Sequence, residues 1–239
     1  MKLNKNVHRG IMLQILADIS SNSLLANNLG FKGGTACYFV HGLDRFSVNL
    51  DFDILDQKKE ELIRKQLIKL LKQYGEIKTR TSIKLKYSDE HQALKIDLSS
   101  KHDINEINTY KILEIASRIP IKVLQKEDIF AHKLVALTDR NCAKSKNPVL
   151  ANRDLYDIYF FFKHDWKFNQ NIIRTCTHKS TPGYLQYASD FIEKYVNETN
   201  ILDRLGELVD DEKRRWVKKN LKNKVLTQLA IQIKLLSSP

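Results

Sequence analysis

The amino-acid sequence predicts an α+β fold in which a β-sheet with flanking helices is followed by a helical C-terminal portion. Two observations support this prediction. Short segments in which apolar and polar residues alternate, as in half-buried strands, all lie before residue 125. After Lys126 the apolar residues recur at helical spacing instead. A chain of 239 residues can hold two small domains, and we predict them at 1–125 and 126–239.

The first domain is predicted to begin with an amphipathic helix over 5–27, with break signals at Ser20–Asn22 and Asn27–Gly30. A short helix is expected at Ala36–His41, and a surface helix with one apolar face at Gln57–Gln73. The predicted strands are 49–55, Ile83–Tyr87, Ala93–Leu98 and Ile119–Leu124. The second and third of these strands should form a hairpin, and Pro120 should lie at a strand start or on an edge strand.

The second domain is predicted to be all helical. Its expected helices are 126–138, 153–163, 184–197, 200–209 and 212–236. The polar segment Asn141–Asn152, which contains Pro148, is predicted to be a loop. The helix at 153–163 is rich in aromatic residues, and we expect them to form core: Tyr156, Tyr159, Phe160, Phe161 and Phe162.

Composition excludes several classes of protein. No apolar run approaches the ~20 residues of a membrane span, and no Walker A, HExxH, GxSxG or CxxC pattern occurs. Cys37, Cys142 and Cys176 have no paired spacing, which indicates a reducing cytoplasm. The net charge of +12 favours nucleic acid or another polyanion as partner. The same charge could simply keep the protein soluble, or reflect an AT-rich genome that favours lysine codons.

The segment from Lys32 to Leu55 has the most informative pattern in the chain. Gly33, Gly34 and Thr35 form a turn that can expose backbone N–H groups to a phosphate, helped by any helix that starts there. Downstream, residues 49, 51 and 53 are polar at alternate positions of a strand and therefore share one face. Two carboxylates at this spacing can hold a pair of divalent ions about 3.5–4 Å apart. Each pattern alone is usually an ordinary turn or strand edge; in this order they predict nucleotide transfer from a triphosphate.

The run KGGTACYFVHGLDRFSVNLDFD, residues 32–53, resembles the signature of the AbiEii/AbiGii toxin family, a branch of the polymerase-β-like nucleotidyltransferases. The resemblance extends over roughly 25–165 and implies a nucleotidyltransferase-like mixed sheet. The chain departs from the family at Asn49, where most members carry Asp. The carboxylate pair could therefore be 49 and 51, or 51 and 53; we predict the second.

The resemblance implies transfer of a nucleoside monophosphate from an NTP to an acceptor hydroxyl, with release of pyrophosphate. Two Mg²⁺ ions would be held by Asp51, Asp53 and Asp97, and the nucleotide by Gly33, Gly34, Thr35, Arg45, Ser47, Lys133 and Asp154. Lys133 and Asp157 would complete the catalytic set. The protein would be the toxin of a toxin–antitoxin or phage-defence pair, with RNA or tRNA as acceptor and a cognate antitoxin as partner. The alternatives are an antibiotic-type transferase that modifies a small molecule, and a non-catalytic binding module.

The predicted site residues that follow the 32–53 motif also have explanations that need no catalytic or binding role. Asp97 could be a third metal ligand, the base that accepts the acceptor's proton, or a salt-bridge partner of a nearby lysine. Lys133 could contact phosphate or be an amphipathic side chain whose charged end reaches solvent. Asp154 and Asp157 share a helix face and could orient the nucleotide or Lys133, or could simply favour the helix dipole.

The segment 212–224 contains seven Lys or Arg residues against one Glu. A basic stripe with an exposed aromatic residue can follow a phosphate backbone and stack a base. We predict nucleic-acid contacts from Lys213, Arg214, Arg215, Trp216 and Lys218. The alternatives are a solvated helix face and a buried Trp216.

Overall fold

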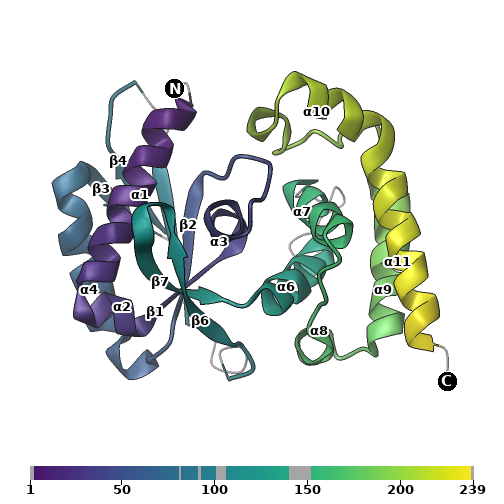
Figure 1. Ribbon diagram of the computed structural model, residues 1–239, viewed down its shortest axis with the longest axis horizontal. Helices are drawn as coiled ribbons and strands as arrows, with labels where there is room; N and C mark the ends of the chain where they lie inside the picture. The colour runs from purple at the N-terminus through teal and green to yellow at the C-terminus, as the bar shows by residue number, and fades with distance from the viewer. Residues whose placement is uncertain (1–2, 81, 91–92, 101–105, 140–151, 238–239) are drawn as a thin grey trace. The chain divides into compact units, whose positions relative to one another are not determined.

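The computed structural model describes residues 3–80, 82–90, 93–100, 106–139 and 152–237. The chain divides into two compact units, Met1–Gln125 (unit 1) and Lys126–Pro239 (unit 2). Figure 1 shows unit 1 in purple to teal and unit 2 in teal to yellow. Each unit has its own core, so each is described by itself.

Unit 1 is built around a mixed seven-stranded sheet with the strand order β3-β4-β5-β2-β1-β7-β6. Its strands are β1 (Leu29–Lys32), β2 (Asn49–Ile54), β3 (Glu76–Thr79), β4 (Ile83–Lys86), β5 (Leu94–Ser99), β6 (Tyr110–Ile115) and β7 (Ile119–Leu124). The pairs β2–β5 and β1–β7 are parallel and the other pairs are antiparallel. The predicted α+β class and the predicted β4–β5 hairpin pairing are therefore confirmed.

Strand β2 lies in the middle of the sheet because its apolar side chains are needed in the core. Leu50 and Phe52 are fully buried, and the Phe52 ring lies 5.2 Å from the ring of Phe31 on β1. The polar residues 49, 51 and 53 alternate with them and point to the opposite face.

The helices of unit 1 cover both faces of this sheet. Figure 1 shows α1 (Lys5–Ser21), α2 (Ser23–Asn28) and α4 (Glu60–Leu71) on one side and α3 (Gly33–Val40) on the other. Helix α3 lies on the side of the polar β2 residues. The predicted helix Gln57–Gln73 is α4 with a short 3₁₀ turn at each end, Gln57–Lys59 and Lys72–Tyr74.

The first predicted helix, 5–27, is two helices. Asn22 interrupts it: its side chain accepts a hydrogen bond from the Leu25 backbone N–H at 3.1 Å and caps α2. This side-chain bond offers the backbone an alternative to a continuous helix. The predicted helix Ala36–His41 is also longer, because α3 begins three residues earlier, at Gly33.

Three strands are absent from the predictions: β1, β3 and β6. The predicted break at Asn27–Gly30 is confirmed for the helix, because α2 ends at Asn28, but strand β1, which begins at Leu29, was not predicted. Pro120 is the second residue of β7, so it lies at a strand start as predicted, although β7 is an interior strand. Short strands next to a Gly or at a sheet edge carry too few residues for a clear period-two pattern.

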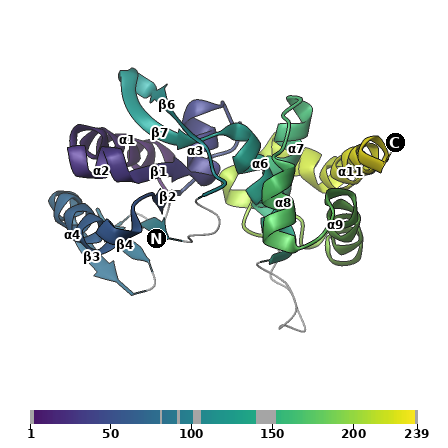
Figure 2. The ribbon, with the colours of Figure 1, turned by 90° about the horizontal axis from the view of Figure 1, so that it is seen from below.

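Unit 2 contains α6 (Lys126–Asp139), α7 (Asn152–Lys163), α8 (Gln170–Thr177), α9 (Thr181–Tyr195), α10 (Asp211–Trp216) and α11 (Lys222–Ser237). The last two are joined by a π-helical turn, Val217–Leu221. Helices α9 and α11 pack side by side, as Figure 2 shows from below. The aromatic core is confirmed: rings of Phe161 and Phe162 meet Phe130 edge-on at 5.1 and 4.9 Å. Tyr159 is only half-buried.

Two predictions in unit 2 were wrong. The expected helix at 200–209 is a series of turns with one 3₁₀ turn at Gly206–Leu208, and α8 was not predicted. The turns form because Asn197 Oδ1 accepts from the backbone N–H groups of Thr199 and Asn200, in competition with a helix. The predicted loop Asn141–Asn152 lies outside the described residues except for Asn152, which begins α7. No described helix is long and apolar enough to cross a membrane.

Candidate active site

Gly33 and Gly34 form the corner where β1 turns into α3. A Cβ on Gly33 would lie 2.7 Å from Asp51 Oδ2, and Gly33 has a positive φ of 76°. A Cβ on Gly34 would lie 2.7 Å from Arg45 Nη2 and 3.2 Å from Ser47 Oγ. Any larger side chain would displace these groups, so close approach favours glycine at both positions, and conformation also favours it at Gly33. The corner therefore brings the Asp51 carboxylate against the first residue of α3.

Thr35, Arg45 and Ser47 form the buried support of this corner. The Thr35 hydroxyl hydrogen-bonds Ser47 Oγ at 2.8 Å and also lies within hydrogen-bond distance of the Asn49 backbone oxygen. Arg45 Nη1 donates to the Phe46 oxygen at 2.9 Å. All three side chains are at least nine-tenths buried. Their hydrogen bonds connect α3, the 41–48 segment and the start of β2, and so hold the corner in one shape.

Asp51 and Asp97 are neighbours across the sheet. They are Cα partners in the parallel β2–β5 register, and Asn49 is the partner of Lys95 in the same register. Adjacent strands are about 4.8 Å apart, so these four side chains occupy one small area of the sheet. The Asp97 carboxylate also pairs with Lys95 at 2.5 Å, with both side chains more than a quarter exposed. Of the roles open to Asp97, the salt bridge is present and a ligand role stays a prediction.

Asp53 has very different surroundings. Lys32 Nζ lies 2.5 Å from its Oδ1, and the Tyr110 hydroxyl donates to its Oδ2 at 2.8 Å. The residue is only 2% exposed. Tyr110 comes from β6 and lies over Gly30, where a Cβ would be 2.2 Å from its ring. Glycine at position 30 thus lets the ring pass across β1 to reach Asp53.

Lys32, Gly30 and Tyr110 are therefore site residues that sequence reasoning missed. A glycine inside a strand often marks the close approach of another group, and Gly30 was such a signal. Lys32 stood directly before the Gly-Gly turn. Nothing in the local sequence linked Tyr110 to Asp53, which lies 57 positions earlier.

His8 supports the strand from its other end. Its Nε2 lies 2.9 Å from the Val48 oxygen, and its Nδ1 lies 2.7 Å from the Tyr87 hydroxyl. In the neutral ring, Nε2 donates to the carbonyl and Nδ1 accepts from the hydroxyl. Burial lowers the pKa of His8, which favours the same neutral form. This ring therefore fixes the backbone immediately before Asn49.

In unit 2, Lys133 lies between two carboxylates of α7. Its Nζ is 2.5 Å from Asp154 Oδ1 and 2.8 Å from Asp157 Oδ2. Both carboxylates are fully buried and Lys133 is 9% exposed. Asp154 and Asp157 share a face of α7 that packs on α6, as the i, i+3 spacing requires. The structure thus brings together, within this unit, the predicted nucleotide-binding residues Lys133 and Asp154 and the predicted catalytic residue Asp157.

Comparison with known proteins gives the family of the chain. The model of a family described as nucleotidyl transferase AbiEii toxin, type IV TA system, matches residues 14–223. The chain belongs to the AbiEii nucleotidyltransferase toxin family. A search of curated proteins finds no match.

Solved structures share the fold of this AbiEii-family chain. JHP933 from Helicobacter pylori has a TM-score of 0.52 at 20% identity, covering 99% of this chain and 97% of that one. A putative nucleotidyltransferase from H. pylori gives 0.54 at 19%, covering 99% and 96%. MenT4, a nucleotidyltransferase toxin from Mycobacterium tuberculosis, gives 0.53 at 13%, covering 95% and 85%. At these identities the likeness establishes the fold alone.

Nucleotidyltransferase families typically use a divalent metal, and the donor atoms here can be tested against that expectation. Among the described residues, no group of three or more His, Cys, Asp or Glu could hold a metal ion. Asp51 and Asp97, however, are oxygen donors on adjacent strands, with the Asn49 amide two positions before Asp51. Mg²⁺ is commonly held by one or two carboxylates, with phosphates and waters completing its shell. The residues therefore fit a Mg²⁺ that arrives with a triphosphate.

The predicted nucleic-acid-binding segment of the AbiEii-family chain contains two kinds of cation: some pair with acidic residues and others are exposed. Lys213 and Arg214 pair with acidic residues at the start of α10, Asp210 at 3.9 Å and Asp211 at 2.8 Å. Arg215 and Lys218 are exposed. The Trp216 ring is half-buried, 4.6 Å from the ring of Tyr159 on α7. Arg215 and Lys218 are thus the predicted cations best placed to meet a polyanion.

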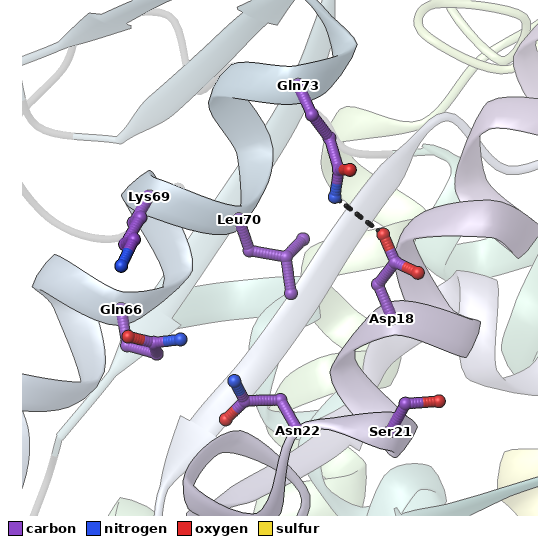
Figure 3. Close-up of a pocket in the computed structure, with 7 residues that line it drawn as sticks. All are labelled: Asp18, Ser21, Asn22, Gln66, Lys69, Leu70 and Gln73. Atoms are coloured by element: carbon purple, nitrogen blue, oxygen red, sulfur yellow. Dashed lines mark hydrogen bonds between the residues drawn. The ribbon is translucent and has the colours of Figure 1, made fainter.

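An open depression of about 420 Å³ lies elsewhere in unit 1, between α1 and α4. Figure 3 shows its lining, in which Gln73 donates to Asp18 at 2.7 Å. Asp18 also accepts from the Tyr74 hydroxyl at 2.5 Å, and burial together with this carboxylate raises the pKa of Tyr74. None of the predicted site residues lines this depression.

Proposed function

We propose that this protein transfers a nucleoside monophosphate from an NTP to a hydroxyl of RNA, releasing pyrophosphate. One observation carries the proposal. Asp51 and Asp97 are paired in register on β2 and β5, and the Asp51 carboxylate lies against Gly33 at the start of α3. A metal-binding carboxylate pair and a phosphate-binding backbone corner are the two parts that nucleotidyl transfer requires.

Each part has a distinct task in the proposed reaction. The corner at Gly33 and Gly34 would receive the triphosphate, because backbone N–H groups at a helix start favour an anion. Asp51 and Asp97 would hold Mg²⁺, two ions if Asp53 shares them, and the metal would neutralise charge on the pyrophosphate that leaves. Thr35, Arg45 and Ser47 keep the corner rigid, which matters because misplacement of reacting groups by about 1 Å can cost a hundredfold in rate.

The unit 2 cluster supplies the remaining predicted residues. We propose that Lys133 contacts the nucleotide phosphates and that Asp154 and Asp157 hold its ammonium in place. A lysine held by two buried carboxylates at 2.5 and 2.8 Å has little rotamer freedom left to lose on binding. Asp97 has a second possible role in the proposed reaction: if it does not bind Mg²⁺, it would be the base that accepts the proton of the acceptor hydroxyl.

RNA is the proposed acceptor because the chain has a net charge of +12 and exposed cations at Arg215 and Lys218. A type IV toxin–antitoxin family also suggests a cognate antitoxin as partner.

The test is to incubate the purified protein with each α-labelled NTP in turn, Mg²⁺ and total cellular RNA. We expect label from one or more NTPs to enter RNA, to require Mg²⁺ and to be absent for Asp51→Asn. Label that enters only a small-molecule fraction would make the protein an antibiotic-type transferase. No transfer from any NTP, by a protein that still binds NTP, would reject the proposed reaction.

The second candidate function is a module that binds nucleotide or RNA without transfer. It is favoured by one observation: Asn49 supplies no negative charge, and its cross-strand partner is the cation Lys95. Both features lower the affinity of that position for Mg²⁺.

A further inference from the structure

The lysine before the Gly-Gly corner has only one partner among the described contacts. Lys32 is the last residue of β1 and the cross-strand partner of Asp51. Its ammonium contacts Asp53 at 2.5 Å, while its side chain remains 25% exposed. An ammonium has three N–H donors, so donors remain available on the solvent side.

Asp53 is occupied at both oxygens. Oδ1 faces Lys32 and Oδ2 accepts from Tyr110, and the carboxylate side chain is 3% exposed. A metal ion at Asp53 would have to compete with the Lys32 ammonium for the same carboxylate. Asp53 has a cation 2.5 Å away and a ring over the neighbouring strand. Its surroundings are those of a group that holds a lysine.

We propose that Lys32 binds the triphosphate of the NTP, and that Asp53 and Tyr110 are positioning residues for Lys32 and not metal ligands. This inference rests on the proposed function, because it names the group that receives the substrate's charge. Lys32 precedes Gly33 in the chain and faces Asp51 across the strands. It is therefore placed to contact an anion that occupies the Gly-Gly corner. A lysine already fixed by Asp53 loses less side-chain entropy when the phosphate binds.

A purely structural role for the pair makes a different prediction. A partly buried ion pair is weak evidence for stability, since apolar side chains of similar volume often stabilise as well. If Lys32 only neutralised Asp53, removal of both charges together would leave anion binding unchanged. If Lys32 binds phosphate, the double variant would lose binding while keeping its fold. The two roles can therefore be separated by one pair of substitutions.

The experiment titrates inorganic tripolyphosphate with Mg²⁺ into the full chain by calorimetry. The variants are Lys32→Met, Asp53→Asn, Tyr110→Phe and the double Lys32→Met/Asp53→Asn. We expect Lys32→Met to weaken binding about 10- to 100-fold, the value of a lost charge-assisted hydrogen bond. Asp53→Asn and Tyr110→Phe should weaken it about three- to tenfold, since Lys32 remains but is less fixed. The double variant should bind no more weakly than Lys32→Met alone.

The double variant also guards against unfolding, because it leaves no unpaired buried carboxylate. The matched control is Lys86→Met, which removes a β4 lysine whose ion pair with Asp89 is also 2.5 Å long; its affinity should stay at the wild-type value. Mn²⁺ binding, followed by its electron spin resonance, tests the second half of the inference. Asp53→Asn should keep the wild-type Mn²⁺ affinity, whereas Asp51→Asn should lose it.

Equal tripolyphosphate affinity of the wild type and the folded double variant would overturn the phosphate-binding role of Lys32 and would leave the proposed function unaffected. Loss of Mn²⁺ binding in Asp53→Asn as large as in Asp51→Asn would make Asp53 a metal ligand and overturn its positioning role. A wild type that binds neither tripolyphosphate nor any NTP would reject the proposed function together with this inference.

Discussion

Asp51 and Asp53 are the same residue type, two positions apart on one face of β2. Asp51 lies at the open end of this face, partly exposed, beside Asp97 and the Gly33 corner. Asp53 lies at the closed end, 2% exposed, with Lys32 on one oxygen and Tyr110 on the other. Strand periodicity places two side chains on one face, but neighbours from other elements decide what each carboxylate can do.

The largest expected effect separates these two aspartates. Asp51→Asn should lower nucleotidyl transfer by about a thousandfold, about 4 kcal/mol of transition-state stabilisation, while thermal unfolding changes little. Asp53→Asn should do the reverse: transfer within about tenfold of wild type and a lower free energy of unfolding, by about 1–3 kcal/mol, because two buried hydrogen bonds are weakened. Transfer assays and thermal melts on both proteins measure this. Similar losses of transfer in the two variants would remove the distinction between the ends.

Lys133 extends the comparison to unit 2, where a lysine is again held by carboxylates. Lys133→Met should weaken NTP binding about 10- to 100-fold and leave RNA affinity unchanged, because its proposed contact is with the nucleotide phosphates. Titrations of NTP and of RNA measure the two affinities. Lys163→Met, at the exposed end of α7, is the control and should change neither. A larger loss of RNA affinity than of NTP affinity would assign Lys133 to the acceptor.

The sequence predicts the features of β2 that depend on contacts between residues close together along the chain. The alternation of Leu50 and Phe52 with Asn49, Asp51 and Asp53 predicts β2 and its polar face, because strand periodicity is local. The Gly33–Gly34 turn before a helix is local as well. The family resemblance leads to Asp97 and Lys133 through their motifs. These predictions need no knowledge of which distant residues meet.

The closed end could not be predicted in this way. It depends on a tyrosine from β6 that crosses Gly30, and β6 itself has no clear period-two pattern. The pairing of Lys32 with Asp53 depends on the β1–β2 register, and β1 was taken for a break because of Gly30. The split of α1 from α2, by contrast, lies at the predicted break signal Ser20–Asn22, because the Asn22 side-chain cap acts between residues close in the sequence.

Asn49 tests the open end directly. If positions 49 and 51 form the metal pair, Asn49→Asp should lower the Mg²⁺ concentration needed for half-maximal transfer by about tenfold, since it adds a charged ligand. If the pair is formed otherwise, the two Mg²⁺ titration curves should superimpose. Lys95 is the cross-strand partner of position 49 and would form an ion pair with a carboxylate placed there, which would compete with Mg²⁺ for that carboxylate. The double variant Lys95→Met/Asn49→Asp removes this ion pair, so its Mg²⁺ titration reports the effect of the new carboxylate on metal binding alone.

The basic segment offers a smaller effect with its own matched control. Arg215→Gln/Lys218→Gln should weaken RNA binding by several-fold and lower the salt slope by up to about two, because exposed cations release counterions from RNA. Lys213→Gln/Arg214→Gln removes the same charge, but Asp210 and Asp211 already pair with those cations. Its effect on the slope should be smaller. Equal slopes for wild type and the first variant would make the segment an ordinary solvated face.

The smallest expected effect concerns the backbone that leads into the open end. His8 is buried and neutral, so its pKa lies below 6.5 in the folded state and near that value when unfolded. Below about pH 6.5 the unfolded chain therefore binds more protons at this residue. Stability contributed by neutral His8 is present above that pH and is lost as pH falls, with a slope of at most about 1.4 kcal/mol per pH unit.

Urea unfolding of wild type and His8→Gln between pH 5 and 8 measures the contribution of this one residue, because the other histidines cancel in the difference. The difference in unfolding free energy should shrink as pH falls below about 6.5. Hydrogen exchange should respond locally too, when it is expressed as protection factors that correct for the slower intrinsic exchange in acid. Lower pH should reduce protection at Val48–Leu50, where His8 contacts the Val48 oxygen, before it reduces protection at Phe52–Ile54 at the closed end. A uniform loss of protection along β2 would show that its two ends are one cooperative element.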